Sequence, residues 1–518
     1  MSSGSPIPIV DLFAGPGGLG EGFSSLNNGN SFRTLVSAEM EPSAHSTLRL
    51  RSFYRILKRE GGRALDSYYR FCNGAANAPW DERTAKAWEE AGKEARQITL
   101  GTAEGNRELD GILKKSGLGR ARPWVLIGGP PCQAYSLVGR SRNKGKCDYR
   151  PEDDHRHFLY REYLQIIHKY QPSVFVMENV KGILSSKVSN QRIFHTILRD
   201  LADPDVPFGK KSEDGYRIYS LSSPTTFERG MSPDEIDVHQ FIVRSEEYGI
   251  PQARHRVILL GVREDVARAP KHLEKTSEAE VLDAISELPP LRSRISKGKD
   301  SADEWHKLMK ANLKQLLNEA SKRKEHAGLV KELDRLQRNL AHELDHGSLR
   351  TPRNNGKTAR DSELGRWYHD KRLKVWLNHE ARSHMPPDLL RYLYASAYAK
   401  AYGRSPKGHS EFDLPGLRPD HKNWESGKFS DRFRVQLASG PSTTVTSHIA
   451  KDGHYYIHPD PSQCRSLTVR EAARLQTFPD NYFFQGNRTQ QFHQVGNAVP
   501  PMLAAKIAKV VAGLLTAS

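Results

Sequence analysis

Cysteine is scarce in this chain of 518 residues. Its four cysteines are Cys72, Cys132, Cys147 and Cys464. They are too few and too scattered for a disulfide framework or a paired zinc site, so we expect a protein of a reducing compartment with a free thiol. Long apolar runs are also missing. We find no stretch of about 18 apolar residues, and therefore expect no membrane span. The first residues lack the basic-then-apolar pattern of a secretory signal.

Acidic residues are outnumbered by basic ones. The sequence has 78 Lys and Arg against 61 Asp and Glu, a formal net charge of +17. Residues 111–150 hold nine basic residues and one acidic residue (9 − 1 = +8), and residues 347–410 hold thirteen and five (13 − 5 = +8). This excess favours a polyanionic partner, with nucleic acid as the first candidate. Two solvated loops would carry the same charge, so charge alone leaves both interpretations open.

The first half of the chain alternates short apolar runs with helical segments. Five apolar runs have the character of buried strands: residues 7–10, 35–38, 124–127, 174–177 and 257–260. A glycine-rich stretch at 14–20 follows the first run, and Glu39 ends the second about 20 residues later. Such a layout is typical of a nucleotide-type site at the carboxyl edge of a parallel sheet. We therefore predict a doubly wound, Rossmann-like α/β domain.

The pattern changes after about residue 268. Leucines at helical spacing between 308 and 344 predict a helical hairpin. The heptads are too few for a dimerising coiled coil, so the hairpin is expected to pack on its own domain. Further helical sequence runs to about Tyr402, and the Ser/Thr-rich stretch 433–458 has the character of strands. These features predict a second, smaller α+β domain.

Several side chains able to do chemistry follow or precede the predicted strands. Cys132 lies in a Pro-Pro-Cys-Gln turn, Glu178 ends the next strand, and Arg254 and Arg256 alternate across the start of another. A lone cysteine is usually a small core residue, a carboxylate can simply cap a helix, and an arginine can be a surface residue. A thiol, a carboxylate and an arginine pair that all fall at strand ends beside a glycine-rich turn are better explained together, as an active site.

Six motifs, in this order along the chain, make the sequence resemble the bacterial DNA cytosine-5 methyltransferases. They are Asp11–Gly18, Gly129–Gln133, Glu178–Val180, Gln252–Arg256, Arg470–Pro479 and Gln494–Pro501. A single glycine-rich turn would be a weak signal, whereas six motifs in the family's order are very specific. They tie roughly residues 5–265 and 440–515 to the family.

The resemblance implies a role for each matching residue. Cys132 would attack carbon 6 of a flipped cytosine, and Glu178 would hold the base and donate a proton to N3. Arg256 would bind the O2 oxygen of the base, while Arg254 braces the site and Asn179 pins the Pro-Cys turn. The residues implied to enclose S-adenosylmethionine are Asp11, Phe13, Gly15, Gly17, Gly18, Gly20, Glu39, Pro130 and Asn497.

The expected partner is double-stranded DNA. The resemblance places Gln133 and Ser136 on an active-site loop near the DNA backbone, and the charge pattern adds the arginines Arg140, Arg350, Arg353 and Arg360 as DNA contacts. Base-specific contacts are expected from the second basic segment and from the sequence near Thr443–Thr446. No metal is expected at His155 and His157, because the family needs none and the neighbouring acidic residues suit a helix start.

The stretch Gln97–Thr102 departs from the family pattern, because it lacks the acidic residue that usually touches the adenine amine. Adenine recognition is therefore left unassigned. We expect a catalytic domain at 1–267, a target-recognition domain at 268–476, and a segment at 477–518 that returns to the catalytic domain. The sequence thus predicts a monomeric DNA (cytosine-5)-methyltransferase of the bacterial cytosol, at the nucleoid. It would be either a restriction–modification enzyme with a separately encoded endonuclease or a methylase without one.

Three other functions were weighed. A transfer-RNA cytosine-5 methyltransferase would share the Pro-Pro-Cys site, but the large region 268–476 suits the reading of duplex sequence better. A non-catalytic DNA-binding protein on the same scaffold would not need Cys132, Glu178 and both arginines intact. A nicotinamide dehydrogenase accounts only for the first 40 residues or so.

Overall fold

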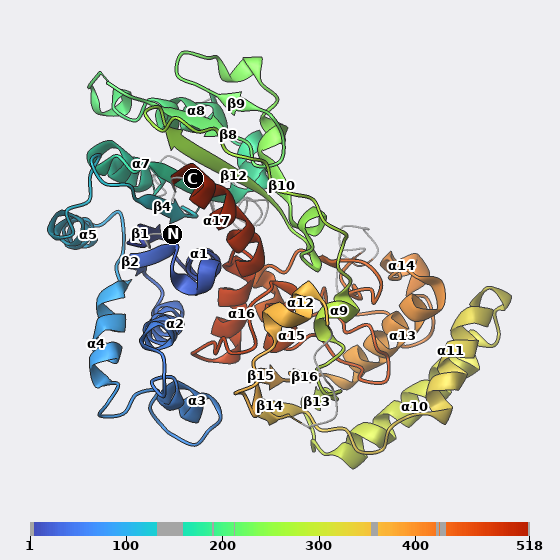
Figure 1. Ribbon diagram of the computed structural model, residues 1–518. Coiled ribbons are helices and arrows are strands. Elements are labelled where there is room, and N and C mark those ends of the chain that lie inside the picture. Colours follow the sequence, from blue (N-terminus) through green and yellow to red (C-terminus); the bar gives the residue numbers. More distant parts are fainter. Residues whose placement is uncertain are drawn as a thin grey trace.

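The computed structural model describes residues 5–131, 159–188, 191–211, 213–353, 361–420, 424 and 431–515. Its central feature is a nine-stranded sheet with the order β3-β2-β1-β4-β5-β12-β8-β9, in which β10 also pairs with β12 (Figure 1). The strands are β1 (Ile7–Leu12), β2 (Phe32–Glu39), β3 (Ala95–Gln97), β4 (Val125–Gly128), β5 (Val174–Val180), β8 (Tyr216–Tyr219), β9 (Thr226–Phe227), β10 (Ile242–Arg244) and β12 (His255–Arg263). All five apolar runs predicted as strands are present, so that prediction is confirmed.

Strand direction decides which side chains can meet. Strands β3, β2, β1, β4 and β5 are parallel, whereas β12 runs antiparallel to β5. The carboxyl ends of the parallel strands and the amino end of β12 therefore reach the same edge of the sheet. This edge, which we call the catalytic edge, gathers the glycine-rich turn after β1, Glu39, Glu178 and the arginines that begin β12.

Helices cover both faces of the sheet. Alternate residues along each strand enter two separate cores, as the period of two requires: Ile9, Val125 and Ile127 belong to one, Val10 and Leu126 to the other. The first core includes α1 (Gly18–Ser25) and α17 (Pro501–Leu515), and the second includes α5 (Ala103–Lys115), α7 (Leu159–Tyr170) and α8 (Ile193–Ala202). The predicted doubly wound α/β architecture is confirmed.

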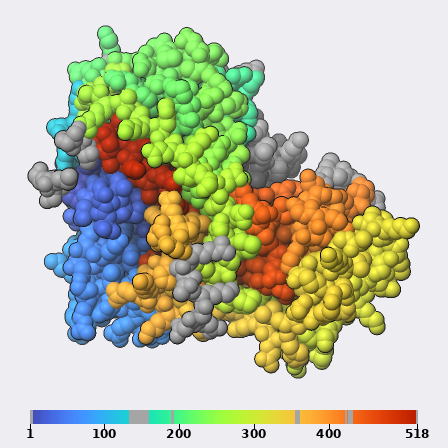
Figure 2. Space-filling model, turned by 45° about the vertical axis from the view of Figure 1, so that its right-hand side comes forward, coloured from blue at the N-terminus to red at the C-terminus, as the bar shows by residue number. Residues whose placement is uncertain are grey.

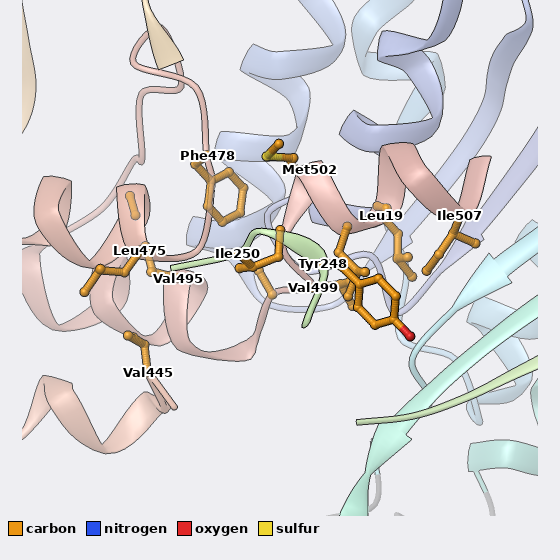
Figure 3. Packing of buried hydrophobic residues seen from close by; sticks show 14 of the residues in the cluster. Leu19, Tyr248, Ile250, Val445, Leu475, Phe478, Val495, Val499, Met502 and Ile507 are labelled. Atoms are coloured by element: carbon orange, nitrogen blue, oxygen red, sulfur yellow. The ribbon is translucent and has the colours of Figure 1, made fainter. Parts of the chain in front are cut away.

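The C-terminal residues return to this domain. Helix α16 (Arg488–Asn497) leads into α17, which packs against α1. Arg488–Leu515 is long and apolar enough to cross a membrane by length and composition, although no such span was expected. Figure 3 shows Leu19 of α1 near Ile507 of α17 inside the protein. With 61% of its most apolar window buried, this segment has the packing of a core helix.

A second lobe projects from the first, seen at the right of Figure 2 as the yellow segment and the darker orange segment beside it. Its own core is built by α10 (Ala302–Ala320), α11 (Ala327–Arg338) and α13 (Pro386–Tyr402). The predicted hairpin is present as α10 and α11, and it packs on α13 of the same lobe. Other residues of 268–476 join the first lobe's core instead: Val445 and Leu475 lie near Val495 in Figure 3. The two lobes are therefore fused through shared apolar packing.

Shorter elements complete the chain. They are α2 (Pro42–Glu60), α3 (Asp66–Cys72), α4 (Ala85–Glu94), β6 (Lys187–Val188), β7 (Gln191–Arg192), β11 (Gln252–Ala253), α9 (Val281–Ile285), β13 (Arg294–Ile295), β14 (Gly347–Pro352), α12 (Glu363–Tyr368), β15 (Val375–Glu380), β16 (Ser383–His384), α14 (Gly408–Glu411), β17 (Ser442–Thr443) and α15 (Val469–Leu475). Helices α2 to α5 occupy most of the chain between β2 and β4, with the short strand β3 among them.

The strand prediction for 433–458 is largely wrong. Within the described part of this stretch, the only strand is β17, which is followed by the 3₁₀ helix η10 (Ser447–Ala450). An isolated bridge pairs Val435 with Ile457. Between these residues side chains bond the backbone: Gln436 Oε1 accepts from Thr443 N at 2.9 Å, and Tyr456 OH accepts from Thr446 N at 3.1 Å. Polar side chains that bond the local backbone compete with regular pairing, which explains the irregular path.

Candidate active site

A tight turn follows β1 at the catalytic edge. Phe13 adopts a positive φ of 57°, and Gly15 and Gly17 follow with φ of 57° and 97°. A left-handed phenylalanine is a strained backbone, of the kind that persists where the surroundings hold it for function. The turn is fixed from the C-terminal side, because the hydroxyl of Tyr482 donates to the carbonyl oxygen of Pro16.

The glycines of this turn differ in what they face. A Cβ on Gly18 would lie 2.2 Å from the carbonyl oxygen of Val499, and one on Gly20 would lie 2.9 Å from Asp11 Oδ2. These two glycines allow α1 to pack closely on its neighbours. Gly17 would likewise meet Leu48, whereas a Cβ on Gly15 would have no atom within 4 Å. The open side of the turn is therefore at Gly15, where a ligand could reach the backbone.

Glu39 holds this open side in place. Its carboxylate accepts from Gly15 N at 2.7 Å and from Glu41 N at 2.8 Å. Burial raises the pKa of Glu39 above its ordinary value, against these backbone bonds. The next residue, Met40, is 59% exposed although it is apolar. Sequence analysis missed Met40; its signal was an apolar side chain immediately after the residue that ends a buried strand.

Asp11 is the most unusual carboxylate of this region. It is fully buried in β1, and neither of its oxygens has a well-oriented hydrogen-bond donor among the residues that the structure describes. Burial raises its pKa to about 8, with Arg55 opposing and Glu39 adding to the shift. A buried carboxylate without a partner, next to an open turn, provides an acceptor for a cationic ligand.

Glu178 and Arg256 form an ion pair at the same edge. Arg256 Nε lies 2.9 Å from Glu178 Oε1, and both side chains are mostly buried. The register explains the contact: Ile258 lies opposite Glu178, so Arg256 is its diagonal neighbour on the same face. Burial lowers the pKa of Arg256, and the Glu178 carboxylate opposes this shift. The pair offers a carboxyl group and a cation side by side.

Arg254 lies behind this pair and is 2% exposed. Its Nη1 donates to the carbonyl oxygens of Val445 at 3.1 Å and Gly496 at 3.2 Å. Burial lowers its pKa to about 9, with Arg256 adding to the shift. Gln252 has a similar position but was not predicted as a site residue: its Oε1 accepts from Val445 N at 2.7 Å and its Nε2 donates to Leu475 O at 3.2 Å.

The turn before the predicted nucleophile reaches the same place. Asn179 Nδ2 donates to Pro130 O at 3.2 Å, and a Cβ on Gly129 would lie 3.0 Å from Glu178 Oε2. Cys132 itself lies outside the described residues, as do Gln133, Ser136, Arg140 and Arg360. Asn497 is described and is exposed at the end of α16, one residue after the Gly496 carbonyl that Arg254 holds.

Two arginines predicted to contact DNA are engaged within the protein. Arg350 donates to the carbonyl oxygens of Cys72 and Phe71, at 3.0 and 3.1 Å. Arg353 lies 2.8 Å from Asp480 Oδ2 and covers the ring of Trp376 at 3.9 Å. Both guanidinium groups are thus engaged by protein partners that join the lobes. We therefore do not propose Arg350 or Arg353 as DNA contacts.

Comparison with known proteins identifies the family of this chain. A family model described as "C-5 cytosine-specific DNA methylase" matches residues 112–208 and 234–512. This chain belongs to the C-5 cytosine-specific DNA methylase family. The Bacillus paralicheniformis type II methyltransferase M.Bpa9945I is 32% identical and the Thalassovita gelatinovora M.AgeI is 25% identical; each alignment covers 97% of this chain and 98% of the relative. A solved structure of a prophage-encoded E. coli protein described as a DNA modification methyltransferase has 19% identity and a TM-score of 0.48, covering 98% of this chain and 99% of that one.

Membership in the cytosine methylase family makes the chain a methyltransferase of DNA. The six motifs that suggested the family lie within or next to the segments described above. Four of them converge at the catalytic edge, and Arg470–Pro479 contributes buried cations that join the lobes: Arg470 Nε donates to Leu377 O at 2.7 Å, and Arg474 pairs with Asp480 at 2.8 Å.

Proposed function

We propose that this methylase transfers a methyl group from S-adenosylmethionine to carbon 5 of a cytosine that is rotated out of a specific duplex DNA sequence. The observation that carries the proposal is the Glu178–Arg256 ion pair, at 2.9 Å, on the edge where the glycine turn and the Pro130 turn meet. A carboxyl group beside a cation matches the hydrogen-bonding edge of cytosine, which offers N3 and the amino group to an acid and O2 to a cation.

The proposed chemistry starts from a weak nucleophile. Carbon 5 of cytosine becomes reactive when the Cys132 thiolate adds to carbon 6, because the ring loses its aromaticity and carbon 5 becomes an enamine carbon. Glu178 gives a proton to N3, and Arg256 stabilises the charge that develops on O2. S-adenosylmethionine, when bound, supplies the methyl group. Loss of the proton on carbon 5 to solvent then restores the double bond and expels the Cys132 thiolate, and N3 returns its proton to Glu178.

The positioning residues support this sequence of steps. Arg254 has no direct role at the base in this scheme; it fixes the start of β12 through Val445 and Gly496, and so orients Arg256. Asn179 holds the carbonyl of Pro130 and so fixes the chain leading to Cys132. Since these contacts are made within the protein, the site is organised before the base arrives.

The residues around Gly15 fit the proposed cofactor. The cofactor is cationic, and the buried carboxyl group of Asp11 has no well-oriented side-chain donor among the residues that the structure describes. Glu39 is positioned to accept the hydroxyls of a ribose, and the exposed Met40 offers an apolar surface beside it. We propose that Asp11, Phe13, Gly15 and Glu39 hold S-adenosylmethionine, with Pro130 and Asn497 closing the site.

The substrate is proposed to be duplex DNA because the base must leave its stack, at a cost of a few kcal/mol that basic segments can offset through phosphate contacts. The relatives are named type II methyltransferases, which favours the modification enzyme of a restriction–modification system, acting as a monomer in the bacterial cytosol beside a separately encoded endonuclease.

Transfer of radioactive methyl groups tests the proposal. The protein is incubated with tritiated S-adenosylmethionine and either duplex DNA or transfer RNA, and the product is digested to nucleosides. We expect label only in 5-methylcytosine from DNA. Glu178→Gln, which keeps the shape of the side chain, is expected to lower the rate by about a hundredfold to ten-thousandfold. Label in transfer RNA, or in another base, would overturn the proposal.

A further inference from the structure

A hollow of about 650 Å³ lies where the second lobe meets the start of α16, and it is lined by none of the residues named at the catalytic edge. Four segments that are distant in sequence line it: Ser296, residues of 382–388, residues of 450–454, and residues 487–489. The hollow is of a size that takes a small organic group. Nothing in the site described above uses it.

Three cations face this hollow: Arg382, Lys451 and Arg488. Arg382 is 8% exposed, and it donates from Nη1 to Ile449 O at 3.1 Å and from Nη2 to Ala450 O at 2.9 Å. Lys451 and Arg488 have no carboxylate within 4.0 Å in the part of the chain that the structure describes. Arg488 makes one long hydrogen bond, from Nη1 to Ala381 O at 3.4 Å.

The acidic residues of the hollow do not cancel this charge. Asp388 pairs with Arg391 at 2.7 Å, and Asp452 lies 3.7 Å from Arg432. Both of these arginines are outside the lining, but Asp452 also acts on Arg382, and Glu380 acts on Arg488 from outside the lining. Burial lowers the pKa of His384 and His454, which keeps both imidazoles neutral near pH 7. With three cations and two carboxylates, the lining keeps a net charge of +1 (3 − 2), which favours an anion.

The hollow is connected rigidly to the catalytic edge. Helix α16 has ten residues, Arg488 to Asn497, and is therefore about 15 Å long. Its last turn holds Arg254 through Gly496 O, and its first turn opens into the hollow. The segment Val445–Ala450, which includes the 3₁₀ helix η10, makes a second link. Arg254 donates to Val445 O at one end of this segment, and Arg382 donates to Ala450 O at the other. A distance of about 15 Å equals roughly four nucleotide steps at 3.4 Å each.

From this arrangement we infer that the hollow binds a phosphodiester of the DNA substrate, about four nucleotides from the flipped cytosine. Lys451 and Arg488 contact the phosphate, and Arg382 is a positioning residue that holds the Ile449–Ala450 turn in place. The inference rests on the proposed function, because it identifies where the same duplex is held. Free phosphate offers the same chemistry, and the test below separates the two sources.

Salt dependence of duplex binding tests the inference. Each lost phosphate contact should reduce the slope of log K against log salt by about 0.9. Because both side chains contact the same phosphate, we expect the Lys451→Gln and Arg488→Gln double variant to lose about 0.9 from the slope between about 50 and 200 mM salt. Lys314→Gln, an exposed lysine of α10 outside the hollow, is the matched control and should leave the slope unchanged. Thermal melting checks that every variant is folded.

Duplexes with one neutral methylphosphonate provide the second arm. Replacement of the phosphate three to five nucleotides from the target cytosine should weaken binding by the parent protein, but not by the double variant. An unchanged slope in the double variant would overturn the inference, as would a methylphosphonate effect of equal size in both proteins. Binding of inorganic phosphate to the parent protein but not to the double variant, together with the same salt slope for duplex binding in both proteins, would assign the hollow to free anions instead. If the parent protein binds the duplex but does not methylate it, the proposed function fails while the slope test of the hollow still applies.

Discussion

The carboxyl group of Asp11 predicts a specific pH dependence of stability. Burial raises its pKa from 3.8 to about 8 in the folded protein. Because the folded protein then binds a proton more tightly than the unfolded chain does, stability falls as pH rises from the unfolded value toward the folded one, and levels off above it. The shift of about 4 units corresponds to about 6 kcal/mol in all, or about 1.4 kcal/mol for each pH unit.

Asp11→Asn removes this titration while keeping the shape of the side chain. We expect the stability of the variant, relative to the parent protein, to rise by about 1.4 kcal/mol per pH unit between pH 5 and 8, and to stay constant above pH 8. Urea unfolding of both proteins across this range measures the difference, and groups that titrate alike in both cancel. A difference that does not change with pH would mean that Asp11 is ionised throughout, and would refute the reasoning.

Four other outcomes follow from the contacts of the site. Binding of the cationic cofactor next to Asp11 should lower the pKa of the Asp11 carboxyl group and release a proton. The heat of binding at pH 7 should therefore vary with the ionisation enthalpy of the buffer. A heat that is the same in all buffers would contradict the contact between Asp11 and the cofactor. Arg254→Ala should lower stability by about 2 to 5 kcal/mol, since two carbonyl oxygens lose a donor and a buried side chain is lost; unfolding that matches the parent protein would exclude the bracing role. Gly18→Ala should disrupt the packing of α1 and lower the melting temperature, since its Cβ would lie 2.2 Å from Val499 O. Gly15→Ala is the contrasting variant, because it should fold but bind the cofactor less tightly. Equal melting temperatures for the two variants would argue against this difference. Arg256→Lys keeps the charge but loses the planar fork, so its turnover should fall while its melting temperature changes little, and an undiminished turnover would argue against a contact with the base.

Sequence alone predicted the sheet and the convergence at its edge well. The strands are continuous apolar runs, and the parallel order brings Leu12, Glu39 and Glu178 to the same edge of the sheet. The ion pair between Glu178 and Arg256 was not predicted, although both residues were. It depends on the antiparallel register of β12 on β5, which no local pattern reveals.

The second lobe was harder to predict because its residues act at long range. Arg350 and Arg353 lie in a basic segment, yet each contacts a residue far away in the sequence. Their partners are Phe71 and Asp480, 279 and 127 residues away. Charge counting cannot distinguish such an arginine from one that faces DNA. Similarly, the Thr443–Thr446 stretch has strand-forming residues, but its backbone N–H groups donate to Gln436 Oε1 and Tyr456 OH, and these bonds determine its path. The hollow was not predictable either, because four separate segments build it.

The central claim is that the Cys132 thiol adds to a cytosine that the protein then methylates. Bisulfite sequencing of DNA from cells that express the protein tests this claim most directly, with Cys132→Ser as the control variant. The account predicts protected cytosines within one short repeated sequence for the parent protein, and none for the variant. The same methylation pattern in the Cys132→Ser cells would contradict the account, because the thiol would then not be the group that adds to the base.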